Sequence, residues 1–526
     1  MGQREKILIS IYLIDLRVPK KVYLSSMQKP ILVLLFLLPF LGIAKRPNII
    51  FILTDDQGYG DVNAHGHPYL KTPHTNKLRE ESVSFDNFYV SPSCSPTRAA
   101  LLSGMHEFRT GVTHTIPPRQ QLDEKVVCFP ELLKKNGYRT GFVGKWHLGN
   151  SPGPSGQGFD WCSTNQAGPN AHFDAVFVRN RKRMESKGYR EDVFFDESMA
   201  FIEEAGDDPF FCYLCTYSPH TPLAAPEKFI KPFRDAGLND THATYLAMVE
   251  NIDYNLGRLM KFLKDTGRDK NTIVIMVNDN GVTEGLDVYN ANMRGSKCSA
   301  WEGGTRAFSF WRWPGKWKPR IMGNLTAHLD VFPTICELTG TKIPANLKPK
   351  LEGNNLLPLL DSKGQVKDWQ KDRILFHHVA RWPSGFAEHH KYAMAGVRQG
   401  NFLMLRSHHC GNQDCLKYMS QCMALQAIEK GRTVHTYAYG TAQYHWGLSP
   451  KNKWVLFDVK KDPGCKNDLA DKKPGLVISL DNAYSKWWDD TYPEMIAMGG
   501  DAGNPDEGRQ AAKKSSNWKG NTTDKK

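Results

Sequence analysis

The stretch Pro47-Asn48-Ile49-Ile50-Phe51-Ile52-Leu53, followed at once by Thr54-Asp55-Asp56, decides the expected fold of this chain. An apolar run of this length, without regular polar alternation, predicts a β-strand that is buried on both faces. Strands of that kind belong to parallel sheets, because helices must then cover each apolar face. The two adjacent carboxylates at the end of the run place polar chemistry at the carboxyl end of this strand.

Three more stretches repeat this design, in which an apolar strand runs into a polar cluster. They are Tyr138–Val143 before Gly144-Lys145-Trp146-His147, Phe210–Cys215 before Thr216-Tyr217-Ser218-Pro219-His220, and Thr272–Val277 before Asn278-Asp279-Asn280. Helical patterns alternate with the strands, over Cys128–Asn136, Glu197–Glu204 and Ala243–Lys264. The sequence therefore predicts an α/β fold with a large, mainly parallel sheet sandwiched by helices. Because ligands bind at the carboxyl ends of such strands, the four polar clusters should form one site.

Two of these strand ends carry the residues for a metal site, Asp55, Asp56, Asp279 and Asn280. Three carboxylates and an amide are hard oxygen ligands, which suit Ca²⁺ or Mg²⁺ better than zinc. Adjacent carboxylates also repel each other unless a cation lies between them. We therefore expect this group to hold Ca²⁺, with Mg²⁺ as the alternative.

Basic side chains come from the other strand ends and from one loop. Lys145 and His147 alternate along a stretch that we expect to be extended, so both can face the same side. His220 follows the third strand, and Lys297 lies in the loop Arg294–Arg306. These four residues are expected to join the site of the acidic group.

The stretch Ser93–Gly104 carries a thiol at the expected start of a helix. Pro96 suits the first turn of a helix and Gly104 can end it, so a short helix is expected to begin near Cys94. Free N–H groups and the helix dipole favour an anion at such a helix start. Arg98 lies one turn further along and can reach back to the same place.

These motifs resemble the signatures of the formylglycine-dependent sulfatase family. The family motif Cys-x-Pro-x-Arg is present from Cys94 to Arg98, and its tail reads Leu102-Ser103-Gly104, with Ser103 where threonine is usual. Gly-Lys-Trp-His-Leu-Gly, Pro-His-Thr-Pro and a lysine ahead of Glu-Gly-Gly-Thr-Arg also match. The resemblance covers about residues 47–306, with weaker similarity to about residue 471. It implies an alkaline-phosphatase-like fold and hydrolysis of sulfate esters.

The resemblance also implies a set of roles. A maturation enzyme would oxidise Cys94 to formylglycine (3-oxoalanine), whose gem-diol attacks sulfur and whose oxygen joins the metal site. Arg98, Lys145 and Lys297 would neutralise the sulfate oxygens. His220 would protonate the leaving alcohol, with Lys297 as a possible partner, and His147 would remove a proton to re-form the aldehyde. Lys145, His220 and Lys297 would therefore also bind substrate.

The domain organisation is expected to change after a catalytic domain at 45–360. Short strand-like pieces at 373–376, 392–397, 401–406 and 453–458, with a helix near 484–488, predict a small antiparallel-sheet α+β subdomain over 361–500. Residues 501–526 are rich in Gly, Asn, Lys and Asp and are expected to be disordered. At the other end, residues 27–44 have the pattern of a secretory signal peptide, and residues 1–26 read as a misassigned upstream start.

A cleaved signal would export the mature chain from Lys45, to the periplasm or outside the cell, or to lysosomes in a eukaryote, without a stable membrane anchor. An uncleaved membrane anchor is the alternative. Export makes disulfides possible among the eleven cysteines, most plausibly within the cluster Cys410, Cys415 and Cys422. Cys212 and Cys215 lie at positions i and i+3 of one strand, so they should face opposite sides, which argues against a redox or zinc role.

The formal net charge of +13 favours polyanionic partners, and the absence of nucleic-acid motifs argues against DNA or RNA. Histidine, arginine and tryptophan side chains in the C-terminal part could bind sulfated sugars, chiefly Arg381, His408 and His409. We therefore expect a sulfated oligo- or polysaccharide as substrate. The alternatives are a small aryl sulfate, a phosphonate or phosphate diester, and a non-catalytic role in binding sulfated glycans.

Overall fold

A computed structural model describes residues 45–165, 171–412, 414–415, 429–430, 448–450 and 452–504. The expected signal peptide, Cys422 and all of the expected tail beyond residue 504 lie outside the described residues. Within the described ranges, no helix combines the length and the apolar character needed to cross a membrane.

The fold is organised around a ten-stranded mixed sheet. In spatial order its strands are β12 (Arg320–Met322), β2 (Val83–Phe85), β11 (Ser309–Arg312), β9 (Thr272–Asn278), β1 (Asn48–Thr54), β8 (Phe210–Cys215), β4 (Arg139–Gly144), β5 (Trp161–Asn165), β6 (Val176–Arg179) and β7 (Lys182–Glu185). The central run β9-β1-β8-β4-β5 is parallel throughout, and antiparallel pairs occur only nearer the edges. The four strands expected from the sequence are therefore the adjacent strands β9, β1, β8 and β4 of this parallel centre.

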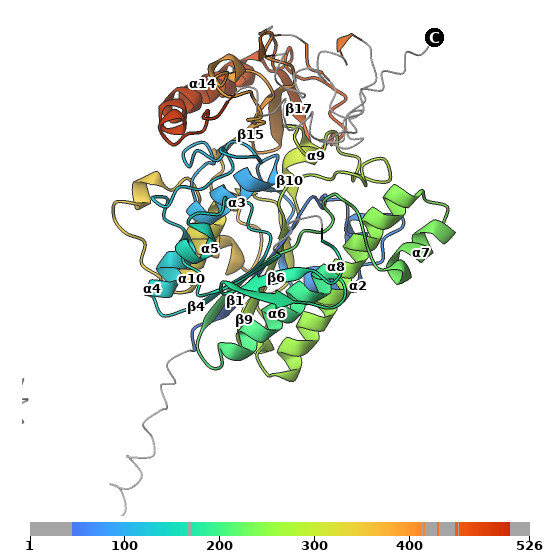
Figure 1. Ribbon diagram of the computed structural model, residues 1–526. Coiled ribbons are helices and arrows are strands. Elements are labelled where there is room, and N and C mark those ends of the chain that lie inside the picture. Colours follow the sequence, from blue (N-terminus) through green and yellow to red (C-terminus); the bar gives the residue numbers. More distant parts are fainter. Residues whose placement is uncertain are drawn as a thin grey trace, which may run out of the picture. The chain divides into compact units, whose positions relative to one another are not determined.

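Helices cover both faces of the sheet (Figure 1). Ile49, Phe51 and Leu53 of β1 pack in one apolar cluster with α4 (Phe129–Lys135) and α10 (Val331–Leu338). Ile50 and Ile52 pack on the other face with α6 (Arg190–Glu204) and α8 (Asp240–Asp265). This alternation explains why β1 is apolar at nearly every position, because both of its faces are core.

The remaining elements are short, apart from the helix α14. They are α2 (Pro73–Glu80), α3 (Cys94–Ser103), α5 (Gly153–Gly156), α7 (Glu227–Asp235), α9 (Glu302–Thr305), α11 (Leu357–Leu360), α14 (Pro474–Ala497), the 3-10 helices at Asn63–His65, Asp269–Asn271, His328–Asp330, Lys348–Lys350 and Glu388–His390, and a small sheet of β10 (Arg306–Ala307), β3 (Phe88–Tyr89) and β13 (Thr326–Ala327).

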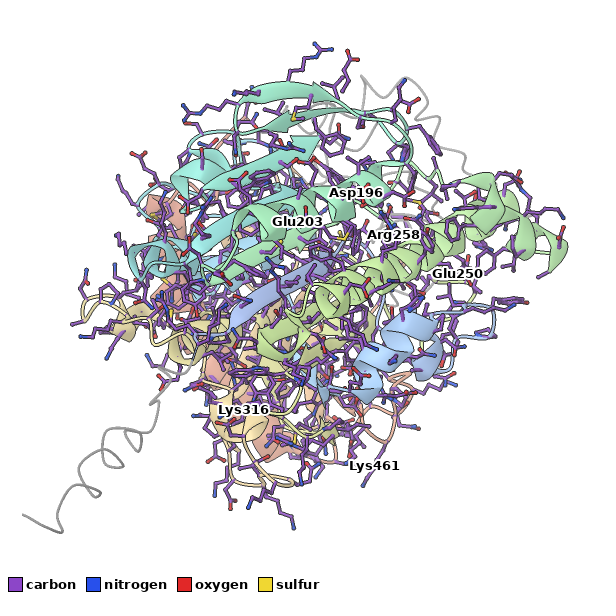
Figure 2. The ribbon with its side chains drawn as sticks, turned by 90° about the horizontal axis from the view of Figure 1, so that it is seen from below. Asp196, Glu203, Glu250, Arg258, Lys316 and Lys461 are labelled. Carbon is purple, nitrogen blue, oxygen red and sulfur yellow. The ribbon has the colours of Figure 1, made fainter. Side chains whose placement is uncertain are left out.

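Helix α6 begins at Arg190, well before the expected start at Glu197. Its first turn holds a buried ion pair of 3.0 Å between Arg190 and Glu191, and charged residues give no apolar period from which to predict a helix. On its outer side, Asp196 pairs with Arg258 of α8 at 2.5 Å. Figure 2 labels both residues. The contact links the two helices that cover this face of the sheet.

A four-stranded antiparallel sheet follows, as expected for the C-terminal part. Its strands are β14 (Ile374–His378), β15 (Ala395–Gln399), β16 (Phe402–Arg406) and β17 (Val455–Asp458). Helix α14 lies beside it (Figure 1) and is much longer than the helix expected near residues 484–488. Tyr484, Trp487 and Trp488 of α14 pack with Val397 and Met404 of the sheet, which accounts for this aromatic-rich stretch.

The cysteines of β8 face opposite sides of the large sheet, as the strand spacing predicts. Cys215 lies in the apolar cluster with Phe51, whereas Cys212 lies in the cluster with Ile50. Gly144 ends the neighbouring strand β4 with φ +105°, and a Cβ atom there would lie 1.8 Å from the carbonyl oxygen of Cys215. Only glycine fits this position, where the chain leaves the sheet toward Lys145.

Candidate active site

Two pairs of polar residues lie side by side at the carboxyl edge of the sheet. β1 and β9 are parallel neighbours with Thr54 opposite Asn278, so Asp55-Asp56 and Asp279-Asn280 leave the sheet together. The backbone N–H of Asp56 donates to Oδ1 of Asp279 at 3.1 Å. Asp56 has a φ of 64°, a left-handed conformation that turns the chain sharply at the strand end.

Helix α3 begins at Cys94 as expected, with Ser93 in the extended conformation before it and Gly104 at φ 69° after it. The Cys94 side chain is buried, and its Sγ lies within 4.8 Å of carboxylate oxygens of Asp55 and Asp279. The thiol is therefore beside the acidic group. Burial raises the pKa of Cys94, although the charges of Lys145 and Lys297 counteract that effect.

Arg98 joins the same group from the next turn of α3. Its guanidinium donates to Oδ2 of Asp279 at 2.8 Å and to the backbone carbonyl of Lys145 at 2.7 Å. The arginine is fully buried, so these two acceptors hold its fork in a fixed place. Arg98 also lies 3.7 Å from Oδ1 of Asp55, so its guanidinium connects the ends of β9, β4 and β1.

Two lysines complete the cationic half of the site. Nζ of Lys145, just beyond β4, lies 2.6 Å from Oδ2 of Asp55, and Nζ of Lys297 lies 2.6 Å from Oδ1 of Asp56. Nε2 of His220 lies 3.6 Å from the other oxygen of Asp56. Burial alone would lower the pKa of Lys297, but Asp56 together with the other acidic groups around it, including Asp55, raises that pKa above its usual value.

The pKa values of the Asp55 and Asp279 carboxylates are shifted in opposite directions. Burial would raise the pKa of Asp55, but Lys145, His220 and Arg98 together lower it well below its usual range. For Asp279, burial and the neighbouring charge of Asp55 raise the pKa to about 7. Asp279 therefore holds a proton more readily than Asp55, although Arg98 lies beside it.

The donor set fits a hard divalent cation. Oδ1 of Asp55 and Oδ1 of Asn280 are buried and accept no hydrogen bond from any described residue. Nδ2 of Asn280 donates to Asp56 and to the Gly281 carbonyl, which leaves the amide oxygen as the atom available for a ligand. Carboxylate and amide oxygens of this kind are the ligands that Ca²⁺ and Mg²⁺ take in proteins.

His147 reaches the site by a different backbone path from the expected one. Its φ is 57°, so the stretch from Lys145 is not continuously extended and the simple alternation prediction is wrong. The Nε2 atom lies 3.0 Å from the carbonyl oxygen of Thr115, and a carbonyl only accepts, so Nε2 carries the hydrogen. Nδ1 is then the atom with a lone pair, and no described residue bonds to it.

The two histidines have similar electrostatics. Burial lowers the pKa of His147 well below its usual value, and the charges of Lys145 and Arg98 lower it further. Burial also lowers the pKa of His220 to about 4, although Asp56 counteracts that shift. His220 donates from Nδ1 to the carbonyl of Thr221, so Nε2 is its atom on the side of Asp56.

The candidate sugar-binding residues lie in two places. The Arg381 guanidinium donates to Oγ1 of Thr115 at 2.9 Å, on the same threonine whose carbonyl accepts from His147. Arg381 therefore borders the catalytic group. His408 and His409 lie beyond β16, where their Nε2 atoms are 3.5 and 2.9 Å from the two carboxylate oxygens of Glu429.

Sequence reasoning missed two supporting residues. Thr115 lies in a loop without a motif, and its role appears only through its contacts with His147 and Arg381. Tyr245 reads as an ordinary apolar position of α8, yet its Oη lies 2.6 Å from Oδ2 of Asp61 and 2.9 Å from the backbone oxygen of Asp56. The sequence gives no signal for these contacts, because only the fold brings α8 next to Asp61.

Comparisons with known proteins identify the family of this chain. A sequence model of the family described as Sulfatase matches residues 47–341. N-acetylgalactosamine-6-sulfatase of Mus musculus is 32% identical over 370 residues, which cover 62% of this chain and 68% of that protein. Arylsulfatase J of Mus musculus is 28% identical over 471 residues, which cover 83% and 74%.

Solved structures with the same fold include sugar complexes. The crystal structure of Ps i-CgsB in complex with k-i-k-neocarrahexaose has a TM-score of 0.71 at 24% identity and covers 90% of this chain and 98% of that one. The structure of BT4656 in complex with its substrate D-glucosamine-2-N,6-O-disulfate has a TM-score of 0.63 at 20% identity, covering 86% and 99%. At these identities the likeness concerns the fold.

Proposed function

Because this chain belongs to the sulfatase family and is a sulfuric ester hydrolase, we propose that its substrate is a sulfated oligo- or polysaccharide. The observation that carries the proposal is the convergence of Arg98, Lys145 and Lys297 on the carboxylates beside Cys94. A group of buried cations at one point suits a compact anion such as a sulfate ester. The names of its relatives and structural neighbours support a sugar, since they include N-acetylgalactosamine-6-sulfatase and a complex with disulfated glucosamine.

The proposal includes a cofactor and a modified residue. Asp55, Asp56, Asp279 and Asn280 would hold Ca²⁺, and a maturation enzyme would convert Cys94 to formylglycine. When present, the cation supplies Lewis acidity and the hydrated aldehyde supplies an oxygen nucleophile. The raised pKa of the buried Cys94 thiol supports a modification, because a neutral thiol is a poor nucleophile.

The cationic residues would bind the sulfate group and stabilise its developing charge. Arg98 is held by Asp279 and by the Lys145 carbonyl, so its guanidinium is already oriented before substrate arrives. The two lysine ammonium groups would shift part of their hydrogen bonding from Asp55 and Asp56 to sulfate oxygens. Preorganised donors of this kind stabilise a transition state without a cost of reorientation during the reaction.

The two histidines would move protons. His220 would donate from Nε2 to the leaving alcohol oxygen, since its Nδ1 is occupied by the carbonyl of Thr221. Burial lowers the pKa of His220 to about 4, so Nε2 can donate only after the ring gains a proton, and the negative charge of a bound sulfate ester would raise that pKa. His147 would act as base through Nδ1, because the Thr115 carbonyl fixes the hydrogen on Nε2.

Arg381 would bind an anionic group of the sugar next to the scissile ester. Its contact with Thr115 places it beside His147, on the border of the catalytic group. His408 and His409 would take part from the C-terminal segment beyond β16. The formal net charge of +13 would favour encounter with a polyanion.

The test is sulfate release by the chain co-expressed with a maturation enzyme. We expect turnover of defined sulfated oligosaccharides with kcat/KM above that of a small aryl sulfate, and above that of a phosphate diester. Preference for the aryl sulfate or the diester would contradict the proposed substrate class. Binding of sulfated glycans without any turnover, by protein whose Cys94 remains a thiol in the native host, would favour a binding role instead.

We also propose that the chain is exported after removal of residues 1–44. Mass spectrometry of protein from the native host should find a mature N-terminus at Lys45 or Arg46. A mature chain that keeps residues 27–44 would contradict cleavage and favour an anchor.

A further inference from the structure

We propose that His390, Cys410 and Cys415 form a second metal site, for Zn²⁺ or a similar soft divalent cation. One ligand atom of each of the three residues lies within 4.8 Å of the other two. Nε2 of His390 is 3.1 Å from Sγ of Cys415. This group is separate from the oxygen-rich site at Asp55 and Asp279, and it takes no part in the proposed chemistry of desulfation.

The type of donor selects the metal. One imidazole nitrogen and two sulfur atoms are soft ligands that favour zinc over calcium or magnesium. On binding, each thiol would release its proton to solvent and bind as a thiolate. His390 and Cys415 are fully buried and Cys410 is half-buried, so the cation would be enclosed on most sides.

The spacing and the local hydrogen bonds of Cys410 and Cys415 are suited to two cysteines that bind one metal ion. Cys410 and Cys415 are separated by four residues, within the spacing found between cysteine ligands of zinc sites. Gly411 has a φ of +80°, and Oδ1 of Asn412 accepts the N–H groups of Asp414 at 2.8 Å and Cys415 at 3.1 Å. These bonds hold the backbone of Asp414 and Cys415 against the side chain of Asn412, two residues after the first cysteine.

The histidine is positioned from an independent part of the chain. His390 ends the 3-10 helix Glu388–His390, and its backbone carbonyl lies 2.9 Å from Nε2 of His378 on β14. The ring of Trp382 lies 5.9 Å from the His390 ring. A metal would therefore join the segment after β14 to the segment after β16.

The second metal site would support the loop Arg294–Arg306, which carries Lys297. Cys298, next to Lys297, shares a buried cluster with Val379, Met394 and Cys415, against which Cys410 packs. Nε1 of Trp301 in the same loop donates to Oγ of Ser407 at 3.0 Å, three residues before Cys410. A cation that fixes the 410–415 loop would thus limit the movement of the loop that carries Lys297, as a positioning element.

The first measurement uses the full, untreated protein. Elemental analysis after gel filtration should find about one zinc per chain beyond any calcium, and X-ray absorption at the zinc edge should show sulfur and nitrogen neighbours. Only oxygen and nitrogen neighbours, or no zinc after dialysis against a zinc buffer, would overturn the proposal. So would a disulfide between Cys410 and Cys415 in peptides mapped without reductant.

Cobalt replacement assigns the residues. Co²⁺-loaded wild-type protein should show a sulfur-to-cobalt charge-transfer band, which the double variant Cys410→Ser/Cys415→Ser should lose. Cys162→Ser, which removes a half-buried thiol near Phe159, should keep the band. Glu429→Gln, which alters the neighbouring His408–His409–Glu429 cluster, should keep it as well. A band that survives the double variant would refute the assignment, and the absorption spectrum of wild type remains decisive if that variant does not fold.

Discussion

Lys145 donates a hydrogen bond of 2.6 Å from Nζ to Oδ2 of Asp55, a residue 90 positions away in sequence. Both side chains are buried, and the same arrangement recurs between Lys297 and Asp56 and between Arg98 and Asp279. Each carboxylate of the site thus has a cationic partner. Addition of a divalent cation would leave surplus positive charge, which is what an incoming sulfate ester would neutralise.

Replacement of Cys94 by alanine should abolish sulfatase activity and leave the fold intact. The side chain is small and buried at the start of α3, and alanine is a good helix former. We expect kcat to fall by more than about 1,000-fold, as for loss of a nucleophile. Sulfate release checks activity, and circular dichroism checks the fold. Full activity of the alanine variant would contradict the role of residue 94.

Removal of the oxygen-bound cation should be reversible. Treatment with EGTA should abolish activity, and addition of Ca²⁺ should restore it. The reason is that buried oxygens of Asp55 and Asn280 accept no hydrogen bond from the described residues and are available as ligands. At about 100 times the dissociation constant, Ca²⁺ should add about 3 kcal/mol to the free energy of unfolding. Thermal denaturation with and without Ca²⁺ measures that gain. An active protein without calcium or magnesium by elemental analysis would exclude this cofactor.

Arg381→Ala should affect sugar substrates more than small ones. Loss of a charged hydrogen-bond donor beside Thr115 should raise KM for a sulfated oligosaccharide roughly 10- to 100-fold, and KM for an aryl sulfate much less. Steady-state kinetics with both substrates gives the comparison. Arg381→Lys keeps the charge and serves as the control. An equal loss with both substrates would instead place Arg381 in the catalytic machinery.

Asp61→Asn should change the pH dependence of stability. Burial raises the pKa of Asp61 to about 7. Hydrogen bonds from Tyr245 and from the backbone N–H of Gly58 lower this pKa, but by less than burial raises it. The folded state therefore binds this proton more tightly than the unfolded state. The resulting stability is complete below about pH 4 and is lost as pH rises through about 7.

The asparagine variant keeps an acceptor for Gly58 and Tyr245 without a charge. Relative to wild type, its free energy of unfolding should therefore rise between pH 5 and pH 8, by an amount on the order of a few kcal/mol. Urea denaturation at several pH values measures the difference between the two proteins. A difference that does not vary with pH would show that Asp61 keeps an ordinary pKa in the fold.

Gly144→Ala should destabilise the sheet at the exit of β4. The new Cβ would collide with the Cys215 carbonyl, and the φ of +105° is strained for any other residue. We expect a loss of several kcal/mol or failure to fold, whereas Gly364→Ala, at an exposed site with no atom within 4 Å, should have little effect. The denaturation midpoints of the two variants test this expectation, and that of Gly144→Ala should be the lower. Equal midpoints would refute the steric argument.

The sequence predicted the centre of the fold because the strands β1, β4, β8 and β9 are apolar on both faces. It missed short strands near the edge of the sheet such as β2, whose three residues Val83–Phe85 are too few to show a period and depend on pairing with β11 and β12. The ligand candidates Asp55 and Asp279 were found for the same reason, since they end parallel strands. Thr115 could not be found, because only tertiary contacts bring it to His147 and Arg381.

The order in which the ribosome makes these residues has a consequence for Cys94. Its thiol is buried beside Asp279 and Lys297, both of which are synthesised much later than the thiol itself. During translation the cysteine therefore passes through a period in which the neighbours that will enclose it do not yet exist. The maturation enzyme proposed above would therefore have access to the thiol before the chain folds around it.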